Sequence, residues 1–189
     1  MPGKERDAAR TRQAVLDAAA RTVAAQGAGA SLDAIARAAG VSKSGLLHHF
    51  RTRDALLLAL ARDLSEQWTA AVHAAVDPRD HAPGRLVRGY VNATFDLLTD
   101  ESQTVEHLLL MAALSAVPGV AGLLKEDTQR WAEALEADGL HPDRALLIVR
   151  AADGSGLAGL YEGGRDPARE QQTRELLLAL SRDDGPFQG

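Results

Sequence analysis

The sequence predicts an all-α fold, and two observations lead to this expectation. Apolar residues recur three or four positions apart in most segments, which is the spacing of one buried helix face. Aromatic residues make up only 4% of the 189 residues, and runs in which β-branched and polar residues alternate are absent, so nothing indicates a sheet. With 46% hydrophobic residues, the chain has ample material for a core.

The first expected helix covers residues 7–26. Its apolar residues follow the spacing of a buried face as far as Val23, and Gly27 lies just past its end. This helix should pack across the two short helices that follow it.

Residues 31–50 have the pattern of two short helices joined by a turn. Ser31 is a good N-cap for the first helix, whose apolar residues follow the i, i+3, i+4, i+7 spacing of one buried face. Gly40 supplies the backbone freedom to leave this helix, and Val41 offers an apolar side chain to the core. Ser42 can then cap the second helix.

In the second helix of this pair, Leu46 and Phe50 lie four positions apart and should face the core. The outward face then carries Lys43, Ser44, Leu47, His48 and part of His49. This arrangement is typical of a helix-turn-helix that binds duplex DNA. An ordinary helical hairpin of a bundle is the alternative.

Charge is divided unevenly along the chain. Residues 1–53 contain nine Lys or Arg and four Asp or Glu, a net charge of +5. Residues 54–189 contain 12 basic and 22 acidic residues, a net charge of −10. The N-terminal part therefore suits a polyanion although the whole chain is acidic, and its binding to DNA should weaken with salt.

A long helix is expected over residues 54–76, with Thr52 as its N-cap. Its apolar ridge repeats every four residues from Leu56 to Trp68 and should link the DNA-binding part to the rest of the chain. Five further helices are expected over residues 83–99, 101–117, 118–138, 142–162 and 167–181. Pro118 is well placed as the first residue of the third of these.

The motif Ile-Ala-Arg-Ala-Ala-Gly-Val-Ser occupies residues 35–42, and Lys43, Leu46, His48, His49, Phe50, Arg53 and Leu56 follow it. Through these residues the first 65 positions, about a third of the chain, resemble the DNA-binding domain of the TetR family of one-component transcriptional regulators. The other two thirds resemble the family only in the number, lengths and breaks of their helices.

The resemblance implies that the second helix of the pair lies in the major groove, where Lys43 and His48 are the first candidates for contacts to bases or phosphates. Thr52 and Arg53 would hold the phosphate backbone. The full set of candidate DNA-binding residues is Ser31, Ser42, Lys43, Ser44, Gly45, Leu47, His48, His49, Thr52 and Arg53.

Two positions of this helix depart from the family pattern. Many relatives have Tyr where this chain has Leu47, so an apolar contact replaces a hydroxyl that often touches a phosphate. Relatives often have Thr where this chain has Gly45, whose missing side chain lets the backbone come closer to DNA. We expect a shifted operator preference and intact DNA binding.

In the TetR family the last two helices of each subunit form the four-helix bundle of the dimer. A narrow stripe of small residues fits that role here, at Leu147, Ala151, Gly154, Ala158 and Tyr161. Tight packing within one subunit is the alternative. We expect a homodimer on a palindromic operator, because one recognition helix reads too few base pairs for genomic specificity.

The resemblance also implies a pocket among the middle helices, where a small-molecule effector would bind and move the long helix. The candidate lining residues are Trp68, Tyr90, Asn92, Phe95, His107, Met111 and Trp131. A plain core position is the alternative for each of them. The expected ligand is a moderately hydrophobic small molecule, and the expected domains are DNA-binding (1–53), connecting helix (54–76), and effector-binding and dimerisation (77–189).

No motif of an enzyme or metal site withstands inspection. Residues 154–159 match the dinucleotide fingerprint G-x-G-x-x-G, but a helical run precedes them where a strand is required. The adjacent His48 and His49 point about 100° apart on a helix and cannot chelate a metal together. We expect a regulator without cofactor or metal, most simply a repressor; an adaptor that binds DNA without a small-molecule ligand is the alternative.

The location of the protein is expected to be cytoplasmic. The chain contains no cysteine, which excludes disulfides, and it has no apolar run of about 20 residues. Its N-terminus is polar rather than a charged start followed by an apolar segment, so nothing indicates export or membrane insertion.

Overall fold

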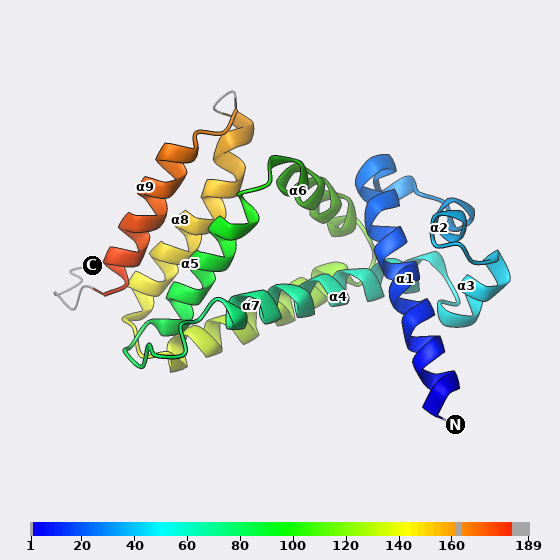
Figure 1. Cartoon of the computed structure of the whole chain (residues 1–189), viewed down its shortest axis with the longest axis horizontal. Coiled ribbons are helices and arrows are strands. Elements are labelled where there is room, and N and C mark those ends of the chain that lie inside the picture. The colour runs from blue at the N-terminus through cyan, green and yellow to red at the C-terminus, as the bar shows by residue number, and fades with distance from the viewer. Residues whose placement is uncertain (1, 162–163, 183–189) are drawn as a thin grey trace. The chain divides into compact units, whose positions relative to one another are not determined.

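The computed structural model describes residues 2–161 and 164–182, except for the side chains of residues 2–5, 28 and 160. These residues form nine α-helices and one short 3-10 helix, without a strand, which confirms the expected all-α fold (Figure 1). The helices are α1 (Pro2–Gln26), η1 (Gly27–Gly29), α2 (Leu32–Ala38), α3 (Lys43–His49), α4 (Arg53–Ala74), α5 (Arg85–Leu97), α6 (Glu101–Ser115), α7 (Val120–Ala137), α8 (Pro142–Tyr161) and α9 (Pro167–Leu180). No single described helix is long and apolar enough to span a membrane; α6 and α7 qualify only as a pair bent by 117°.

The predicted helix boundaries are accurate to within two residues, except that α1 begins at Pro2 rather than at residue 7. The expected last residue of α8, at position 162, lies outside the described residues. The prediction that Pro118 is the first residue of α7 is wrong. Gly119 follows it with a φ of 86°, a left-handed conformation that cannot continue a helix, so α7 begins at Val120.

The chain divides into two compact units, and each is described by itself. Unit 1 combines Met1–Glu66 with Val105–Glu126, and unit 2 combines Gln67–Thr104 with Asp127–Gly189. Helices α4, α6 and α7 therefore contribute residues to both units. This division concerns packing, and the functional division at residues 53 and 76 stays a prediction.

The core of unit 1 joins the first helices to a later part of the chain. Leu16 of α1, Ile35 of α2 and Leu46 of α3 are fully buried. The same cluster includes Leu114 from α6 and Val120 from α7, which are also fully buried. Each such side chain stabilises the fold by about 1.5–3 kcal/mol relative to an exposed one. The α6–α7 corner thus completes the core on which α2 and α3 rest.

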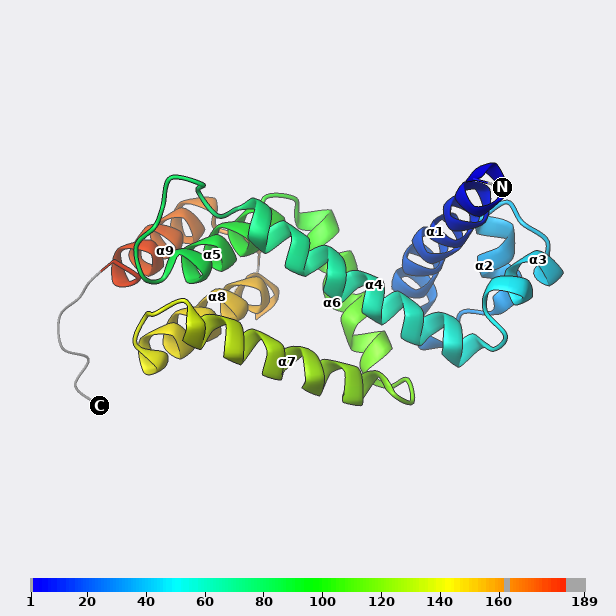
Figure 2. The same cartoon turned by 90° about the horizontal axis from the view of Figure 1, so that it is seen from below.

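Helices α5, α8 and α9 lie side by side in unit 2 and enclose a second core (Figures 1 and 2). The spacing of Val87, Val91 and Phe95 places one apolar face of α5 inward, and all three are buried. They pack in the same cluster as Ile148 of α8 and Leu177 of α9. The amphipathic pattern of α5 thereby fixes which side of this helix faces its two neighbours.

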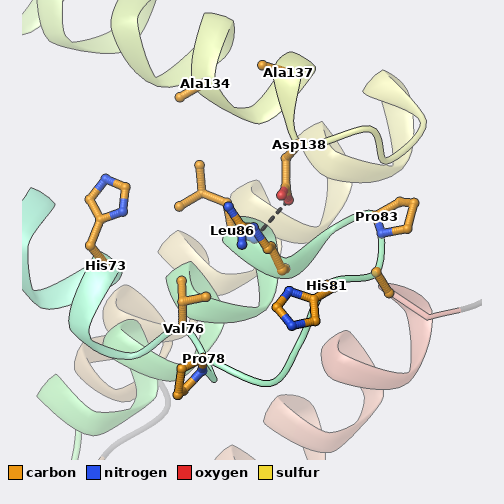
Figure 3. Close-up of a pocket in the computed structure, with 11 residues that line it drawn as sticks. His73, Val76, Pro78, His81, Pro83, Leu86, Ala134, Ala137 and Asp138 are labelled. Atoms are coloured by element: carbon orange, nitrogen blue, oxygen red, sulfur yellow. Dashed lines mark hydrogen bonds between the residues drawn. The ribbon is translucent and has the colours of Figure 1, made fainter.

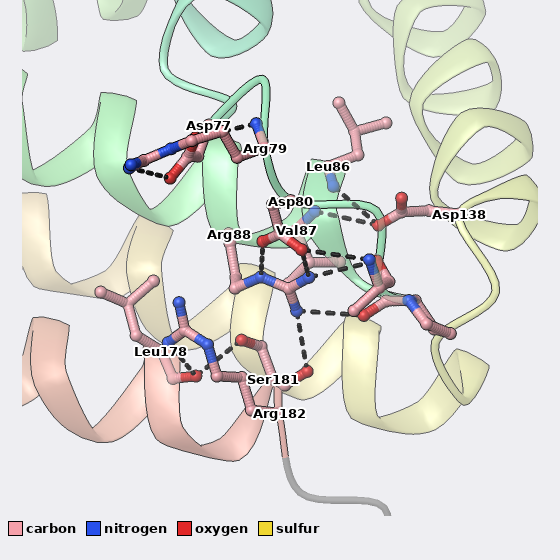
Figure 4. A network of polar contacts seen from close by, with 12 residues as sticks. Asp77, Arg79, Asp80, Leu86, Val87, Arg88, Asp138, Leu178, Ser181 and Arg182 are labelled. Atoms are coloured by element: carbon pink, nitrogen blue, oxygen red, sulfur yellow. Dashed lines mark hydrogen bonds and ion pairs between the residues drawn. The ribbon is translucent and has the colours of Figure 1, made fainter.

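Arg88 ties the start of α5 to the end of α9 (Figure 4). Its buried guanidinium donates to both carboxylate oxygens of Asp80, at 2.6 and 2.9 Å. It also donates to the backbone carbonyls of Ala82, Pro83 and Ser181, at 3.2, 3.0 and 3.1 Å. These bonds compensate for the cost of burying the charge, and the Arg88 bonds lower the pKa of Asp80 below its ordinary value.

Candidate nucleic-acid interface and ligand cavity

The helix pair predicted for residues 31–50 is present as α2 and α3, and local side chains begin both helices. The Ser31 hydroxyl oxygen accepts a hydrogen bond from the Ala34 amide at 3.1 Å. The Ser42 hydroxyl oxygen accepts one from the Gly45 amide at 3.0 Å. Both predicted N-caps are confirmed, and each satisfies an amide that the helix itself leaves free.

The turn between the two helices also follows the prediction. Gly40 has a φ of 67°, and the Val41 amide donates to the Ala36 carbonyl at 3.0 Å, as in a common helix C-cap. Leu46 and Phe50 are buried, with exposed fractions of 0% and 4%. These anchors set the rotation of α3 about its axis and turn its opposite face toward solvent.

The outward face of α3 carries five of the predicted DNA-binding side chains. Lys43, Ser44 and His48 are exposed, and Leu47 and His49 are half-buried. Lys43 Nζ forms an ion pair with Asp33 Oδ2 at 2.9 Å, and both side chains are more than half exposed. A pair so accessible to water contributes little stability, so a DNA phosphate can compete for the lysine. A Cβ at Gly45 would lie 3.2 Å from the capping hydroxyl of Ser42, which places the start of any side chain there beside the cap.

Two further predicted DNA-binding residues lie at the start of α4. Thr52 Oγ1 accepts from the Ala55 amide at 3.1 Å, which confirms it as the N-cap of α4. Arg53 Nε donates to the Ala30 carbonyl at 3.0 Å, and no acceptor among the described residues reaches its buried Nη2 atom. Arg53 thus holds the segment before α2, and its contact with phosphate stays a prediction.

Unit 2 contains a cavity of about 490 Å³ lined by residues of α4, α5, α7 and α8. Trp68, Tyr90 and Trp131, three of the seven predicted pocket residues, line it. The centroid of the Tyr90 ring lies 5.2 Å from that of Trp68 and 5.5 Å from that of Trp131, at interplanar angles of 86° and 83°. Edge-to-face pairs of this kind are favourable by about 0.5–1.5 kcal/mol each. The three rings form one ordered aromatic wall, which we call the aromatic cavity.

Charged side chains complete the aromatic cavity. The Tyr90 hydroxyl donates to Asp153 Oδ1 at 2.6 Å. Burial, followed by the bond to Asp153, raises the pKa of Tyr90 far above its ordinary value, so the phenol stays protonated and is the donor. Asp127 and Arg150 also line the cavity. Sequence reasoning missed these residues, because polar positions on α7 and α8 are expected to face solvent and no local pattern marks them.

The other four predicted pocket residues lie outside the lining of the aromatic cavity as described. Asn92 Oδ1 accepts from Arg174 Nη2 at 2.9 Å and so links α5 to α9. Phe95 is 4% exposed in the core of unit 2. His107 and Met111 are half-buried and belong to unit 1, where burial lowers the pKa of His107.

A second cavity in unit 2, of about 600 Å³, has a different character (Figure 3). The polar and charged groups of its lining come from His73, His81, Arg85 and Asp138. Asp138 Oδ2 accepts from the amides of Leu86 and Val87, at 2.8 and 3.3 Å, and burial raises its pKa. Because this carboxylate caps the start of α5 and the described lining contains no Phe, Trp or Tyr side chain, the aromatic cavity is the better candidate for an organic ligand.

The predicted dimer-forming stripe lies along α8. Leu147, Gly154 and Tyr161 are exposed, and Ala151 and Ala158 are half-buried. Leu146 and Leu157 of α8, and Leu176 and Leu180 of the adjacent α9, are exposed as well. Large apolar side chains that gather on adjacent helices mark a protein-binding surface more often than isolated ones do.

The glycine-rich residues 154–159 lie inside the continuous helix α8, which argues against a dinucleotide-binding turn. A Cβ at Gly154 would meet no described atom within 4 Å, so this position is open to a partner helix. A Cβ at Gly156 would instead lie 3.6 Å from the Leu98 side chain of the same chain. Gly154 of the stripe is thus open, whereas Gly156, which lies outside the stripe, packs within the chain, and the role of the stripe in a dimer stays a prediction.

Comparisons with known proteins match two separate parts of the chain to two family models. Residues 15–60 match the sequence model of "Bacterial regulatory proteins, tetR family", and residues 84–182 match that of "Tetracyclin repressor-like, C-terminal domain". The HTH-type transcriptional regulator RutR of Escherichia coli strain K12 is 32% identical over 108 residues, which cover 57% of this chain and 50% of RutR. The chain thus spans about half the length of the curated relatives that it matches.

Solved structures resemble the fold over most of its length. A member of the TetR family from Streptomyces coelicolor A3 is 29% identical with a TM-score of 0.66, covering 90% of this chain and 97% of that one. The multidrug binding protein EbrR, solved in complex with malachite green, is 32% identical with a TM-score of 0.64, covering 89% and 96% of the two chains. The named relatives are regulators and binding proteins rather than enzymes. Since the second family model alone matches more than half of the chain, the protein belongs to the TetR family of transcriptional regulators.

Proposed function

We propose that this protein is a transcriptional repressor that binds a palindromic operator as a homodimer and releases it when a small molecule occupies the aromatic cavity. The observation that carries the proposal is the presence, in one chain, of a capped helix-turn-helix and an aromatic cavity of about 490 Å³. That volume is within the range of about 300–1,000 Å³ that small-molecule sites occupy. Because the partner is chromosomal DNA, the proposed place of action is the cytoplasm.

The DNA-binding step rests on the outward face of α3 and on the +5 charge of residues 1–53. In the proposed complex α3 lies in the major groove, where Lys43 exchanges its ion pair with Asp33 for a phosphate or a base edge. His48, which is exposed five residues further along α3, contacts the same groove. The −10 charge of the remaining residues is repelled by DNA and favours approach by the basic end.

The homodimer is supported by the exposed apolar residues of α8 and α9, of which Tyr161 is 84% exposed and Leu147 51%. Pairing two copies through these helices would remove this apolar surface from water. The small-molecule step is supported by the complex of the relative EbrR with malachite green, because the two chains share a fold and this chain has its own aromatic cavity.

Footprinting of the promoter of its own gene tests the DNA-binding step. The wild-type protein should protect a two-fold symmetric site. Lys43→Ala should weaken binding by about tenfold or more, as for other contacts to bases or phosphates. Lys125→Ala, which removes an exposed lysine from α7, should bind as the wild type does. Protection of an asymmetric site, or equal losses in the two variants, would contradict the proposal.

Sedimentation and ligand addition test the other two steps. Leu147→Glu should shift the protein from dimer to monomer at micromolar concentration, whereas Ser102→Glu, at an exposed position of α6, should not. Malachite green is the first probe for release of the footprint. A footprint that persists when the cavity is shown to be occupied would favour the alternative, an adaptor that does not respond to small molecules.

A further inference from the structure

The aromatic cavity holds an uneven set of charges. Three carboxylate residues line it, Asp127, Glu136 and Asp153, against one basic residue, Arg150. Asp127 is compensated from outside the lining, since Arg130 Nη2 lies 2.8 Å from its Oδ1 atom. Asp153 and Glu136 then stand against Arg150, which leaves an excess of one negative charge in the lining.

Asp153 is the carboxylate that is built into the aromatic wall. Its Oδ1 atom accepts the Tyr90 hydroxyl at 2.6 Å, and the ring of Tyr90 stands between the two indoles. This single hydrogen bond from a neutral phenol leaves the negative charge of the carboxylate in place, and a carboxylate has acceptor capacity for further donors. The charge of this exposed residue thus lies next to Tyr90, the central ring of the aromatic wall.

The chemistry of such a cavity discriminates among ligands by charge. A neutral aromatic molecule would gain contacts with the rings, but it would cover the Asp153 carboxylate without compensating for the lost water. An anion would be repelled by the excess negative charge. An aromatic cation is attracted to the indole and phenol π-systems and at the same time neutralises the carboxylate.

We infer that the ligand of the aromatic cavity is an aromatic monocation, with Asp153, positioned by Tyr90, as its counter-ion. This inference rests on the proposed function, because it specifies the effector class for the same cavity. Delocalised charge suits the site, since a weakly hydrated cation loses less on leaving water than an ammonium ion does. Arg150, three positions before Asp153 on α8, also lines the cavity and offsets part of its negative charge, which favours a ligand with a single positive charge.

Three probes with one ring skeleton test the inference by isothermal titration calorimetry on the full-length protein without DNA. They are N-methylphenanthridinium, neutral phenanthridine and phenanthrene-9-carboxylate, which differ in charge and little in size. The cation should bind about tenfold more tightly than the neutral probe, and the anion should bind most weakly. Equal affinities for cation and neutral probe, or tighter binding of the anion, would overturn the inference.

A pair of charge-neutralising variants separates the local charge from the general acidity of unit 2. Asp153→Asn keeps an oxygen that can accept from Tyr90, and it should weaken binding of the cation about tenfold while changing the neutral probe less than about twofold. Glu133→Gln, at an exposed site of α7 outside the cavity lining, removes the same charge and should change neither affinity. Equal weakening of both probes by Asp153→Asn would mean that Asp153 only supports the structure, and would refute its role as counter-ion.

Footprints with the same probes distinguish this inference from the proposed function. If the cation binds through Asp153 but leaves the footprint unchanged, the ligand class stands and the proposed release mechanism fails. If the neutral probe binds as tightly as the cation and releases the DNA, the proposed function stands and the inference about charge fails.

Discussion

The helix-turn-helix and the aromatic cavity are assembled in different ways. Residues 31–50 contain the groups that shape the turn and begin the helices of the first, namely two capping serines and a left-handed Gly40, while its buried Leu46 packs in the shared core of unit 1. The cavity instead takes its side chains from four helices, so that Trp68 and Asp153 are brought together only by the packing of unit 2. A surface made by adjacent residues depends on local hydrogen bonds, whereas a cavity depends on the long-range ties that hold helices apart at a fixed spacing.

The largest expected effect concerns the tie made by Arg88. Arg88→Met should lower the free energy of unfolding of unit 2 by about 3–5 kcal/mol, because it leaves the Asp80 carboxylate and several carbonyls without their donor. Urea unfolding followed by tryptophan fluorescence measures this effect, since Trp68 and Trp131 both belong to unit 2. The control Arg79→Met removes an exposed ion pair with Asp77 and should leave the free energy of unfolding unchanged within the error of the measurement.

A smaller loss is expected from Gly89→Ala, which tests how closely α5 approaches the end of α4. An added Cβ would lie 2.5 Å from Val76 Cγ2 and 2.9 Å from the Val72 backbone oxygen. Overpacking of this kind costs about 1–3 kcal/mol, although alanine alone favours a helix. Thermal unfolding measures the change. An unaltered or raised midpoint would show that α5 can move away from the end of α4 without a loss of stability. Gly122→Ala, where an added Cβ meets no described atom within 4 Å, is the matched control and should be neutral or stabilising.

Loss of a cap should be milder and local. Ser42→Ala removes the acceptor for the Gly45 amide and should cost about 0.5–2 kcal/mol, together with a loss of DNA affinity because α3 begins less firmly. Ser102→Ala, at an exposed position of α6 outside the candidate DNA-binding residues, should cost less than about 0.5 kcal/mol and leave DNA affinity unchanged. Unfolding curves and footprint titrations on both variants measure the difference. Equal losses of stability and DNA affinity in the two variants would show that the Ser42 cap is not a specific requirement of the helix-turn-helix.

The smallest expected effect is a pH dependence from His107. Burial lowers its pKa below the ordinary value of 6.5, so the unfolded chain binds the proton more readily than the folded one. The resulting stability is present above the unfolded pKa and is lost as pH falls through that value toward the folded pKa. The urea midpoint of the wild type should therefore fall between about pH 7.5 and pH 5.5 by more than that of His107→Gln. An identical fall in both would show that His107 does not contribute.

The sequence was informative where residues act on their neighbours. Ser31, Ser42 and Thr52 could be identified as caps because a capping bond spans only two or three residues, and Leu46 because helical spacing gives its direction. The prediction that α7 begins at Pro118 fails because the next residue, Gly119, has a positive φ that interrupts the helix, and a rule based on proline alone does not consider the following residue.

The aromatic cavity could be predicted only in part. Bulky rings on the middle helices must be packed against other groups, which makes Trp68, Tyr90 and Trp131 reasonable candidates. Size alone, however, cannot separate a cavity wall from a core position such as Phe95. Asp153 could not be predicted as a cavity residue because the hydrogen bond that connects it to the cavity comes from the Tyr90 hydroxyl, 63 positions away in the sequence. That partnership exists only after α5 and α8 have packed.

Helix α8 lines the aromatic cavity and also belongs to the proposed dimer surface, and Leu146 takes part in both. Leu146 lines the aromatic cavity and is also 56% exposed among the apolar residues proposed to pair two subunits. A mutation that reshapes the cavity at this position would alter subunit pairing in the same step. In the proposed dimer, evolution toward a new ligand is therefore restricted at Leu146 by the need to keep the partner subunit.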